Sequence, residues 1–281
     1  NSGLWTALRT RPFSRIPKIS STPTSIFVTA TDTSPHAPDP QPLIEARLSE
    51  FVNGLRVLSR ICGQRLWVCL GNPEFKSSSI DAFESVPNAK VVRFLGKHPS
   101  GLAGTHITKL EPCGLGKTVW TIGYQDVIAI GDLFVNGVFP THRTIALSGP
   151  MVKDPRLLRV RRGSSIVEIC KGELKDGPAR LISGSILNGR EVLPGLDGLG
   201  AYANQISVIG DGDPREFLGW IMPTLRRFSA ARTVPSKYVR KLFNMTTALY
   251  GGPRAIIPNR LFYNVMPIHV APTFLFKALE I

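Results

Sequence analysis

The first hundred residues alternate between short β-rich runs and a longer segment with helical periodicity. Residues 25–31 (SIFVTAT), 65–70 (RLWVCL) and 90–95 (KVVRFL) are runs of strand length. Between the first two, residues 43–61 carry apolar side chains at helical spacing, and Gly63 follows as a stop signal. Strands that alternate with helices pair in parallel through right-handed crossovers. The pattern therefore predicts an α/β protein that begins with a Rossmann-like open sheet.

Three further segments continue this predicted domain. Residues 79–85 are expected to form a short helix, and residues 98–106 (HPSGLAGTH) a glycine-rich loop. Residues 119–135 have the apolar spacing of a helix, although Gly123 and Gly131 weaken that pattern because glycine disfavours a helix interior. With these segments the predicted Rossmann-like domain covers residues 1–140.

The pattern changes near residue 140, where short strands and turns replace the long helices. A short helix capped by Ser164 or Ser165 is expected to end at Ile169. Strands are expected at residues 143–147, 157–160, 179–182, 205–209 and 217–222. The β-β-α-β order predicts a β-grasp domain over residues 141–190. Residues 191–281 are expected to form a mixed strand and helix region that leads to a C-terminal domain.

Most of the charge excess lies near the end of the chain. Residues 217–279 contain no Asp or Glu but nine Lys or Arg, in a protein with a formal net charge of +14. A surface of one sign faces nucleic acid, anionic lipid or an acidic partner. No transmembrane helix is expected, because Asn264, Pro267 and Pro272 interrupt the uncharged run 261–276, and a span needs about 20 mostly apolar residues. A membrane role would therefore be peripheral.

The cysteines and histidines do not form a metal-binding pattern. The four cysteines have no CxxC spacing and lie in apolar or glycine-rich surroundings, so we expect reduced core thiols rather than a disulfide, zinc or iron–sulfur role. They are Cys62, Cys69, Cys113 and Cys170. His98 and His106 share one loop, but no third ligand lies nearby, so we expect hydrogen-bonded loop histidines.

Two glycine clusters match phosphate-binding loops only in part. Residues 114–118 (GLGKT) match the end of a P-loop, but Glu111 stands where its first glycine belongs. The glycines at 195, 198 and 200 are spaced opposite to GxGxxG and do not follow the first strand of a sheet. We expect a surface turn at residues 114–118 and no dinucleotide fingerprint at the second cluster. The carboxylates of Glu111 and Asp126 are isolated and no GxSxG elbow occurs, so no catalytic residue is expected.

Residues 4–15 (LWTALRTRPFSR) interleave aromatic side chains with arginines. Arginine donates hydrogen bonds to carbonyl or anionic oxygens, and aromatic rings supply flat apolar contact. The segment is therefore suited to hold a quinone head group or a phosphate. The alternative is that its arginines are solvated while its aromatics pack. The candidate contact residues are Trp5, Leu8, Arg9, Arg11, Phe13 and Arg15.

Several of these segments belong to six longer sequence blocks. They are residues 2–15, 26–35 (IFVTATDTSP), 98–106, 120–134 (WTIGYQDVIAIGDLF), 180–189 (RLISGSILNG) and 244–247 (NMTT). In this order they resemble the A subunit of the bacterial sodium-translocating NADH:quinone oxidoreductase, nearly from end to end. That family is similar in fold to the NADH-binding flavoprotein subunit of respiratory complex I and to an Rnf complex subunit. In that fold a Rossmann-like domain precedes a β-grasp (soluble-ligand-binding) domain.

The resemblance implies a six-subunit inner-membrane complex that passes electrons from NADH to ubiquinone and moves sodium out of the cytoplasm. The A subunit is its peripheral cytoplasmic member, and the flavins and the iron–sulfur centre lie on other subunits. The flavoprotein relative binds flavin and NADH through a glycine-rich loop. The matching residues 3–15 carry bulky Trp5, Arg9, Arg11 and Phe13, which keep the backbone away from a phosphate. No bound cofactor or metal is therefore expected here, and the family's N-terminal carrier-like domain and last helical part are expected to lie outside this chain.

These observations favour an accessory, non-redox subunit that docks on the cytoplasmic membrane face through its basic end and contacts ubiquinone near residues 8–15. Two other functions stay open. A stand-alone nucleotide- or flavin-dependent oxidoreductase would use the same fold, but the glycine loop is missing. A nucleic-acid-binding protein would explain the charge, but no helix-turn-helix, RRM or KH pattern occurs, so nucleic acid is not an expected partner.

Overall fold

The computed structural model describes residues 2–71, 75–114, 116–212, 228, 235–239, 242–248 and 255–280. These residues form two compact units. The first comprises Asn1–Arg143, Arg159–Arg162 and Asn264–Val270, and the second comprises Thr144–Leu158, Gly163–Tyr263 and Ala271–Ile281. The strand expected at residues 217–222 lies outside the described residues. The limits of the three predicted domains stay predictions.

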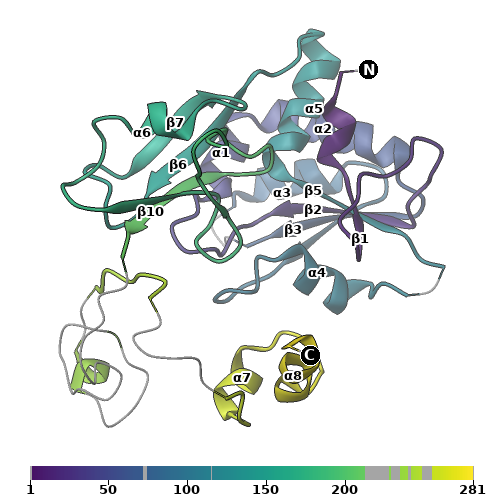
Figure 1. Ribbon diagram of the computed structural model, residues 1–281. Helices are drawn as coiled ribbons and strands as arrows, with labels where there is room; N and C mark the ends of the chain where they lie inside the picture. The colour runs from purple at the N-terminus through teal and green to yellow at the C-terminus, as the bar shows by residue number, and fades with distance from the viewer. Residues whose placement is uncertain are drawn as a thin grey trace. The chain divides into compact units, whose positions relative to one another are not determined.

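A five-stranded sheet with the order β1-β5-β2-β3-β4 forms the centre of the first unit (Figure 1). Strands β2 to β5 pair in parallel, and β1 joins the edge antiparallel to β5. The bounds are β1 Arg9–Arg11, β2 Ser25–Ala30, β3 Arg65–Leu70, β4 Ala89–Arg93 and β5 Val119–Gly123. The predicted parallel α/β order of β2, β3 and β4 is confirmed, whereas β1 was not expected.

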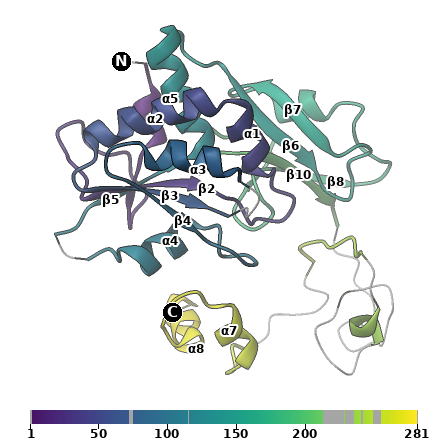
Figure 2. The ribbon, with the colours of Figure 1, turned by 180° about the vertical axis from the view of Figure 1, so that it is seen from behind.

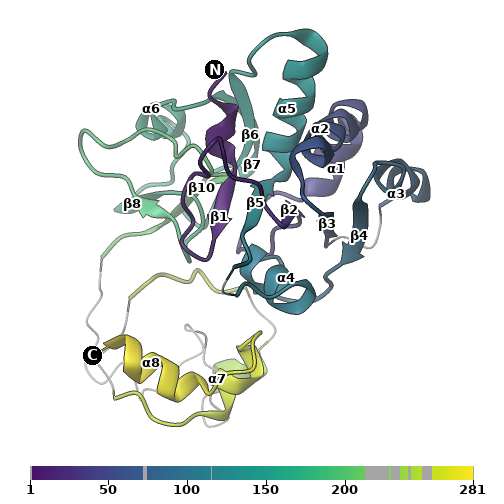
Figure 3. The ribbon, with the colours of Figure 1, turned by 90° about the vertical axis from the view of Figure 1, so that its right-hand side faces the viewer.

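Helices cover both faces of this sheet. In Figures 2 and 3, α1, α2, α3 and α5 lie on one face and α4 lies on the other. Their bounds are α1 Pro40–Ala46, α2 Leu48–Ile61, α3 Ser77–Glu84, α4 Ala103–Leu110 and α5 Tyr124–Asn136, after a short 3-10 helix, η1 Leu4–Ala7. The helix expected over residues 43–61 is two helices that meet at Arg47, which ends α1 and begins α2.

Two expectations about this unit were wrong. The helix expected over residues 119–135 begins only at Tyr124, because the preceding five residues form β5, whose first four side chains are buried in the middle of the sheet. The loop expected over residues 98–106 contains the first turn of α4 from Ala103 onward. Ile107 of that helix packs on Phe27 and Val119, and this burial stabilises a helix that its glycine content does not favour.

The two faces of the sheet build separate cores because successive side chains of a strand point in opposite directions. Ile26 and Val28 belong to the larger core under the four helices, whereas Phe27 packs with Cys69 on the α4 face. All four cysteines are free thiols; Cys113 is half-buried and the other three are buried.

Helices α2 and α5 approach each other closely at two glycines. A methyl group on Gly131 of α5 would overlap the carbonyl oxygen of Glu50, and one on Gly54 of α2 would overlap that of Val127. Backbone atoms cannot rotate away as a flexible side chain does. Both positions therefore need glycine, which explains why a glycine occurs inside each helix.

The second sheet has the order β7-β6-β10-β8-β9. Strand β10 is parallel to β6 and antiparallel to β8. The bounds are β6 His142–Ser148, β7 Arg156–Arg161, α6 Ile166–Cys170, β8 Ala179–Ser183, β9 Arg190–Glu191, β10 Gln205–Gly210, η2 Pro235–Tyr238, α7 Arg260–Val265 and α8 Pro272–Glu280. The predicted β-β-α-β order and the Ser165 cap, which accepts the Glu168 N–H, are confirmed. The central strand β10 lies beyond residue 190, where the predicted β-grasp domain ends.

None of the helices in the described part of the chain combines the length and the apolar character needed to cross a bilayer.

Candidate functional site

The first two candidate residues, Trp5 and Leu8, belong to the core of the first unit. Leu8 is buried, and the Trp5 ring packs edge-on against Trp120 with ring centroids 5.6 Å apart. The Trp5 Nε1–H donates to the carbonyl oxygen of Pro17 at 2.8 Å. The Trp5 ring therefore packs against the core, and its indole hydrogen bond attaches the following loop to the rest of the unit.

The other four candidates lie together on β1 and the loop that follows it. Arg9 and Arg11 stand opposite Thr121 and Val119 of β5, and side chains two residues apart share one face of a strand. The Arg9 guanidinium donates to the Ser14 carbonyl oxygen at 3.1 Å. Burial lowers the pKa of the Arg11 guanidinium, and the neighbouring Arg9 charge lowers it further, whereas the Cys113 side chain acts in the opposite direction.

Beyond β1, the chain places Phe13 and Arg15 at the surface. The Phe13 ring is 78% exposed, and the Arg15 guanidinium carbon lies 6.0 Å from its centroid. Backbone and hydroxyl donors of Thr10 both bind the Arg15 carbonyl oxygen, at 2.7 and 3.1 Å, and close the loop. Arg15 and the exposed Phe13 ring thus lie on the same segment as Arg9 and Arg11; this segment, β1 and the loop 12–19 that follows it, is called the β1 arm.

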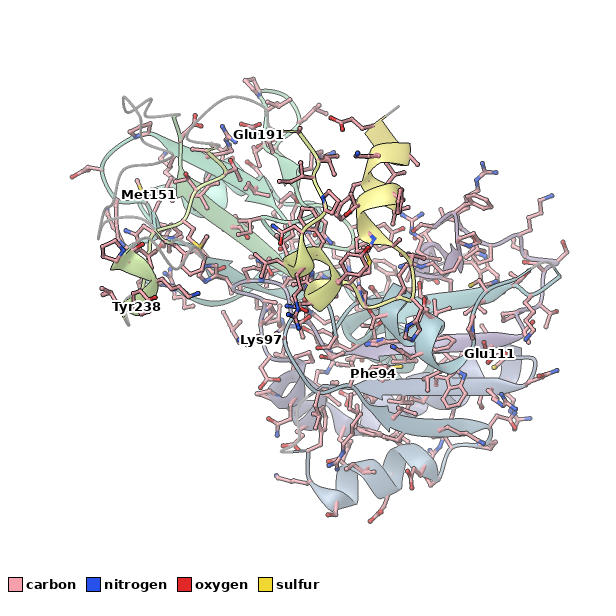
Figure 4. The ribbon with its side chains drawn as sticks, turned by 90° about the horizontal axis from the view of Figure 1, so that it is seen from below. Phe94, Lys97, Glu111, Met151, Glu191 and Tyr238 are labelled. Carbon is pink, nitrogen blue, oxygen red and sulfur yellow. The ribbon has the colours of Figure 1, made fainter. Side chains whose placement is uncertain are left out.

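A hollow of about 300 Å³ opens at the carboxyl ends of β2, β3 and β4. Parallel α/β sheets bind ligands at this edge. Asp32 and Asp39 line the hollow together with Thr33 and Phe94, which is labelled in Figure 4. Asp39 caps α1 by accepting the Gln41 N–H, and two carboxylates disfavour a phosphate here. The lining suits hydroxyl or cationic groups.

The two histidines of the expected glycine-rich loop have separate roles. The His98 Nδ1 lies 3.2 Å from the Thr33 hydroxyl oxygen, whereas His106 is buried in α4 beside the Phe94 ring. The His106 Nε2–H donates to the Ser100 carbonyl oxygen at 2.8 Å, and its Nδ1 is buried without a hydrogen-bond partner. Across the described residues no group of three or more His, Cys, Asp or Glu could hold a metal ion.

Burial of His106 makes the stability of the protein sensitive to acid. Desolvation lowers the pKa of His106 from 6.5 to about 4, so the unfolded chain binds this proton first. The contribution of His106 to the free energy of unfolding is therefore fully present well above pH 6.5 and falls as the pH drops toward 4. We expect a loss of about 2 kcal/mol in the free energy of unfolding between pH 8 and pH 5.

Urea unfolding at the two pH values, with His106→Gln beside the parent chain, checks this expectation. The variant should lose about 2 kcal/mol less than the parent over this range. His142→Gln, which changes an exposed histidine, is the matched control and should behave like the parent. Equal pH dependence of His106→Gln and the parent would contradict the assignment.

Glu111 and Asp126, which looked isolated in the sequence, both have side-chain partners. Glu111, labelled in Figure 4, accepts the Trp67 Nε1–H at 3.2 Å. The Asp126 carboxylate lies 3.1 Å from Arg143 Nη1 and 3.0 Å from Arg162 Nη2, and both Asp126 and Arg143 are almost fully buried. No local sequence pattern predicts these pairs, because the partners are 17 to 44 positions apart in the sequence.

The second unit contains a hollow of about 670 Å³ between α6, β8 and the segment that follows β9. Arg180 Nη2 lies 2.7 Å from an Asp211 oxygen, and Arg180 Nε lies 3.4 Å from an oxygen of Glu191, which is labelled in Figure 4. Glu168 and Asp197 also line the hollow. Four carboxylates around one arginine leave the lining net negative, so a cationic group is the occupant that it favours.

Family models match both parts of the chain in order. The model described as NqrA second alpha/beta domain matches residues 1–139, and the one described as NQRA C-terminal domain matches residues 144–193. The described elements agree with this order, since the α/β fold with its largely parallel sheet precedes the second, mixed sheet. The class of protein is therefore an α/β domain followed by a soluble-ligand-binding β-grasp domain.

Curated relatives, each named as the A subunit of a Na(+)-translocating NADH-quinone reductase, match along nearly the whole chain. Those of Pasteurella multocida, Glaesserella parasuis and Haemophilus influenzae are 46%, 47% and 45% identical, each over 99% of this chain. The chain covers 61%, 62% and 61% of their lengths. This chain belongs to the NqrA family, the A subunits of the Na(+)-translocating NADH-quinone reductases.

Among solved structures, a crystal structure of an NAD+-reducing [NiFe]-hydrogenase is similar with a TM-score of 0.48 and 15% identity. The match covers 68% of this chain and 41% of that chain. This likeness is too low to support a conclusion.

Proposed function

We propose that this protein is a peripheral, non-redox subunit of a sodium-translocating NADH:ubiquinone reductase complex on the cytoplasmic face of the bacterial inner membrane. The match to relatives named as the A subunit over 99% of the chain carries this proposal. Because the chain spans about 61% of their length, its place in such a complex is an inference from the shared part. Its partners are the other subunits of the complex.

Three features of the described residues support a scaffold without its own redox group. The carboxyl-edge hollow presents Asp32 and Asp39 where a nucleotide phosphate would need donors. Residues 3–15, which the resemblance matches to the flavin loop of the flavoprotein relative, contain η1 and β1 and carry large side chains. Within the described part of the chain, the buried thiols of Cys62, Cys69 and Cys170 have no common ligand position. In this proposal the flavins and the iron–sulfur centre would lie on other subunits of the complex.

Purification of the tagged full-length gene product from detergent-solubilised membranes tests this function. Membrane partners with sodium-stimulated NADH:quinone reductase activity should elute with it. A yellow lone protein whose melting temperature rises with NADH would instead indicate a stand-alone flavin enzyme. A lone protein with steeply salt-dependent affinity for DNA or RNA would indicate a nucleic-acid-binding function.

The basic segment 217–279 would contribute membrane contact, at about 1 kcal/mol for each oriented Lys or Arg.

A ubiquinone contact on the β1 arm is the finer part of the proposal. Arg9 and Arg11 would donate to the quinone carbonyl oxygens, and the exposed ring of Phe13 would cover the head group. Leu8 is buried and would act only by holding the arm in place. Trp5 has the same supporting role through its bond to Pro17.

Replacement of Arg9 and Arg11 by Ala should weaken binding of a ubiquinone analogue to the complex. A charged hydrogen bond contributes about 1.5–3 kcal/mol, so Kd should rise about tenfold for each arginine. The matched control removes Lys90 and Arg93, two exposed cations of β4 at the other edge of the same sheet. Unchanged analogue affinity in Arg9→Ala and Arg11→Ala would rule out the contact.

A further inference from the structure

The loop 12–19, between β1 and β2, presents three large apolar side chains to solvent. Phe13, Ile16 and Ile19 recur every third residue and are 78%, 46% and 87% exposed. A single exposed apolar residue is ordinary, whereas three within seven residues form an apolar segment. Residues 134–139 form a second such segment, with Phe134, Val135, Val138 and Phe139 exposed, but no Lys or Arg lies between residues 132 and 141. The quinone contact proposed above does not use Ile16 or Ile19.

The loop is fixed in this outward arrangement. Pro17 is buried, and its carbonyl oxygen accepts the Trp5 Nε1–H at 2.8 Å. On the other side of the loop, Thr10 binds the Arg15 carbonyl oxygen and the Arg9 guanidinium binds the Ser14 carbonyl oxygen. These bonds hold the backbone so that Ile16 and Ile19 cannot fold back onto the core without breaking them.

Along the chain, the charged residues in and next to this loop have one sign. Arg9, Arg11, Arg15 and Lys18 lie among the first 31 residues, and the first carboxylate of the chain is Asp32. An anionic bilayer surface offers phosphates to these cations and an acyl boundary a few ångströms deeper to the apolar side chains. Long cationic side chains can reach the phosphates while their stems stay in apolar surroundings.

We infer that the loop 12–19 is a membrane-contact loop that binds anionic phospholipid by inserting Phe13, Ile16 and Ile19 between the head groups. It is a separate site from the basic segment 217–279. The proposed contact uses residues of this chain only, so vesicles that contain no other subunit can test it on the full-length gene product. A protein partner with an apolar, acidic surface is the alternative occupant, and the test separates the two.

An environment-sensitive dye attached at single cysteines locates the contact. Cys113→Ser removes the half-buried native thiol, and the other three native cysteines are buried. Cysteine is then introduced at Ile16 or Ile19 and labelled with NBD. The control label replaces Val138, which is 67% exposed in the same unit but has no Lys or Arg between residues 132 and 141.

Vesicles of phosphatidylglycerol and phosphatidylcholine, without quinone, should raise and blue-shift NBD emission several-fold at positions 16 and 19. Lipids with a doxyl quencher in the acyl chain should quench it, and the Val138 label should not respond. Pure phosphatidylcholine and high salt should weaken the response. The unlabelled chain with Ile16→Ser and Ile19→Ser should bind the anionic vesicles at least tenfold more weakly.

Two results would overturn the inference. If the chain binds vesicles while the labels at 16 and 19 stay silent, another region such as 217–279 carries the lipid contact. If no vesicle binds at all, the loop faces a protein partner. Failure of the subunit proposal would change neither readout, because the vesicles contain no other subunit.

Discussion

Gly131→Ala is expected to destabilise the first unit by about 3 kcal/mol, at the upper end of the cost of overpacking. In an open helix the same change would stabilise by about 0.5–1 kcal/mol, because alanine has the higher helix propensity. Here the added methyl overlaps the Glu50 carbonyl oxygen of α2, so the two helices must move apart. That movement would open the core that Leu55 and Val127 fill between them.

Urea unfolding of the parent and of Gly131→Ala measures this loss as a lower midpoint at an unchanged slope. Gly104→Ala is the matched control, since Gly104 lies in α4 and a methyl group there meets no atom within 4 Å. It should leave the stability unchanged or raise it. Gly54→Ala should resemble Gly131→Ala, because its methyl overlaps the Val127 carbonyl oxygen. Equal stabilities of Gly131→Ala and Gly104→Ala would show that α2 and α5 can separate at little cost.

Sequence periodicity predicted part of this fold, but it could not predict the role of Gly131. Short β-rich runs predicted β2, β3 and β4. The interior strands β2 and β3 are largely buried and nearly continuously apolar, whereas the edge strand β4 has no buried residue. In the sequence Gly131 appears only to weaken a helix. Its role is to let α5 approach α2, and α2 is far away in the sequence. For residues 119–123 the helical and strand patterns coincide, and burial between β1 and β2 decides in favour of the strand.

The sequence identified the candidate residues of the site but not how the fold places their side chains. Arg9, Arg11, Phe13 and Arg15 do lie on one arm, as their proximity in sequence required. Leu8 and Trp5 could not be assigned to the core without knowing that η1 packs beside Trp120. The strand β1 has only three residues and two arginines, so it carries no apolar alternation that would reveal it.

The carboxyl-edge hollow has one signal in the sequence. Asp32 follows the first parallel strand directly, where a nucleotide-binding fold would place glycine. Asp39 joins it only because the intervening residues turn back to begin α1. Spacing along the chain gives no indication that Gly71 and Phe94 complete the lining, since each comes from the end of a different strand.

Asp126→Ala should cost about 3–5 kcal/mol, because it leaves the buried Arg143 guanidinium without its carboxylate. Asp126 also stands in the first turn of α5, where a negative charge compensates the helix dipole. Arg162 loses the same carboxylate but is partly exposed, so water replaces much of that interaction. The expected result is a lower unfolding midpoint, with the largest part of the loss traceable to Arg143.

A double-variant cycle separates the cost of the buried charge from the value of the pair. Asp126→Leu combined with Arg143→Met removes both charges and should be more stable than Asp126→Ala, because no guanidinium is then buried without a counter-charge. Asp154→Asn breaks an exposed pair with Arg156 and should change the free energy of unfolding by less than about 1 kcal/mol. A cost below about 1 kcal/mol for Asp126→Ala would mean that water enters and solvates Arg143. The cluster would then orient its own side chains but contribute little to the stability of the first unit.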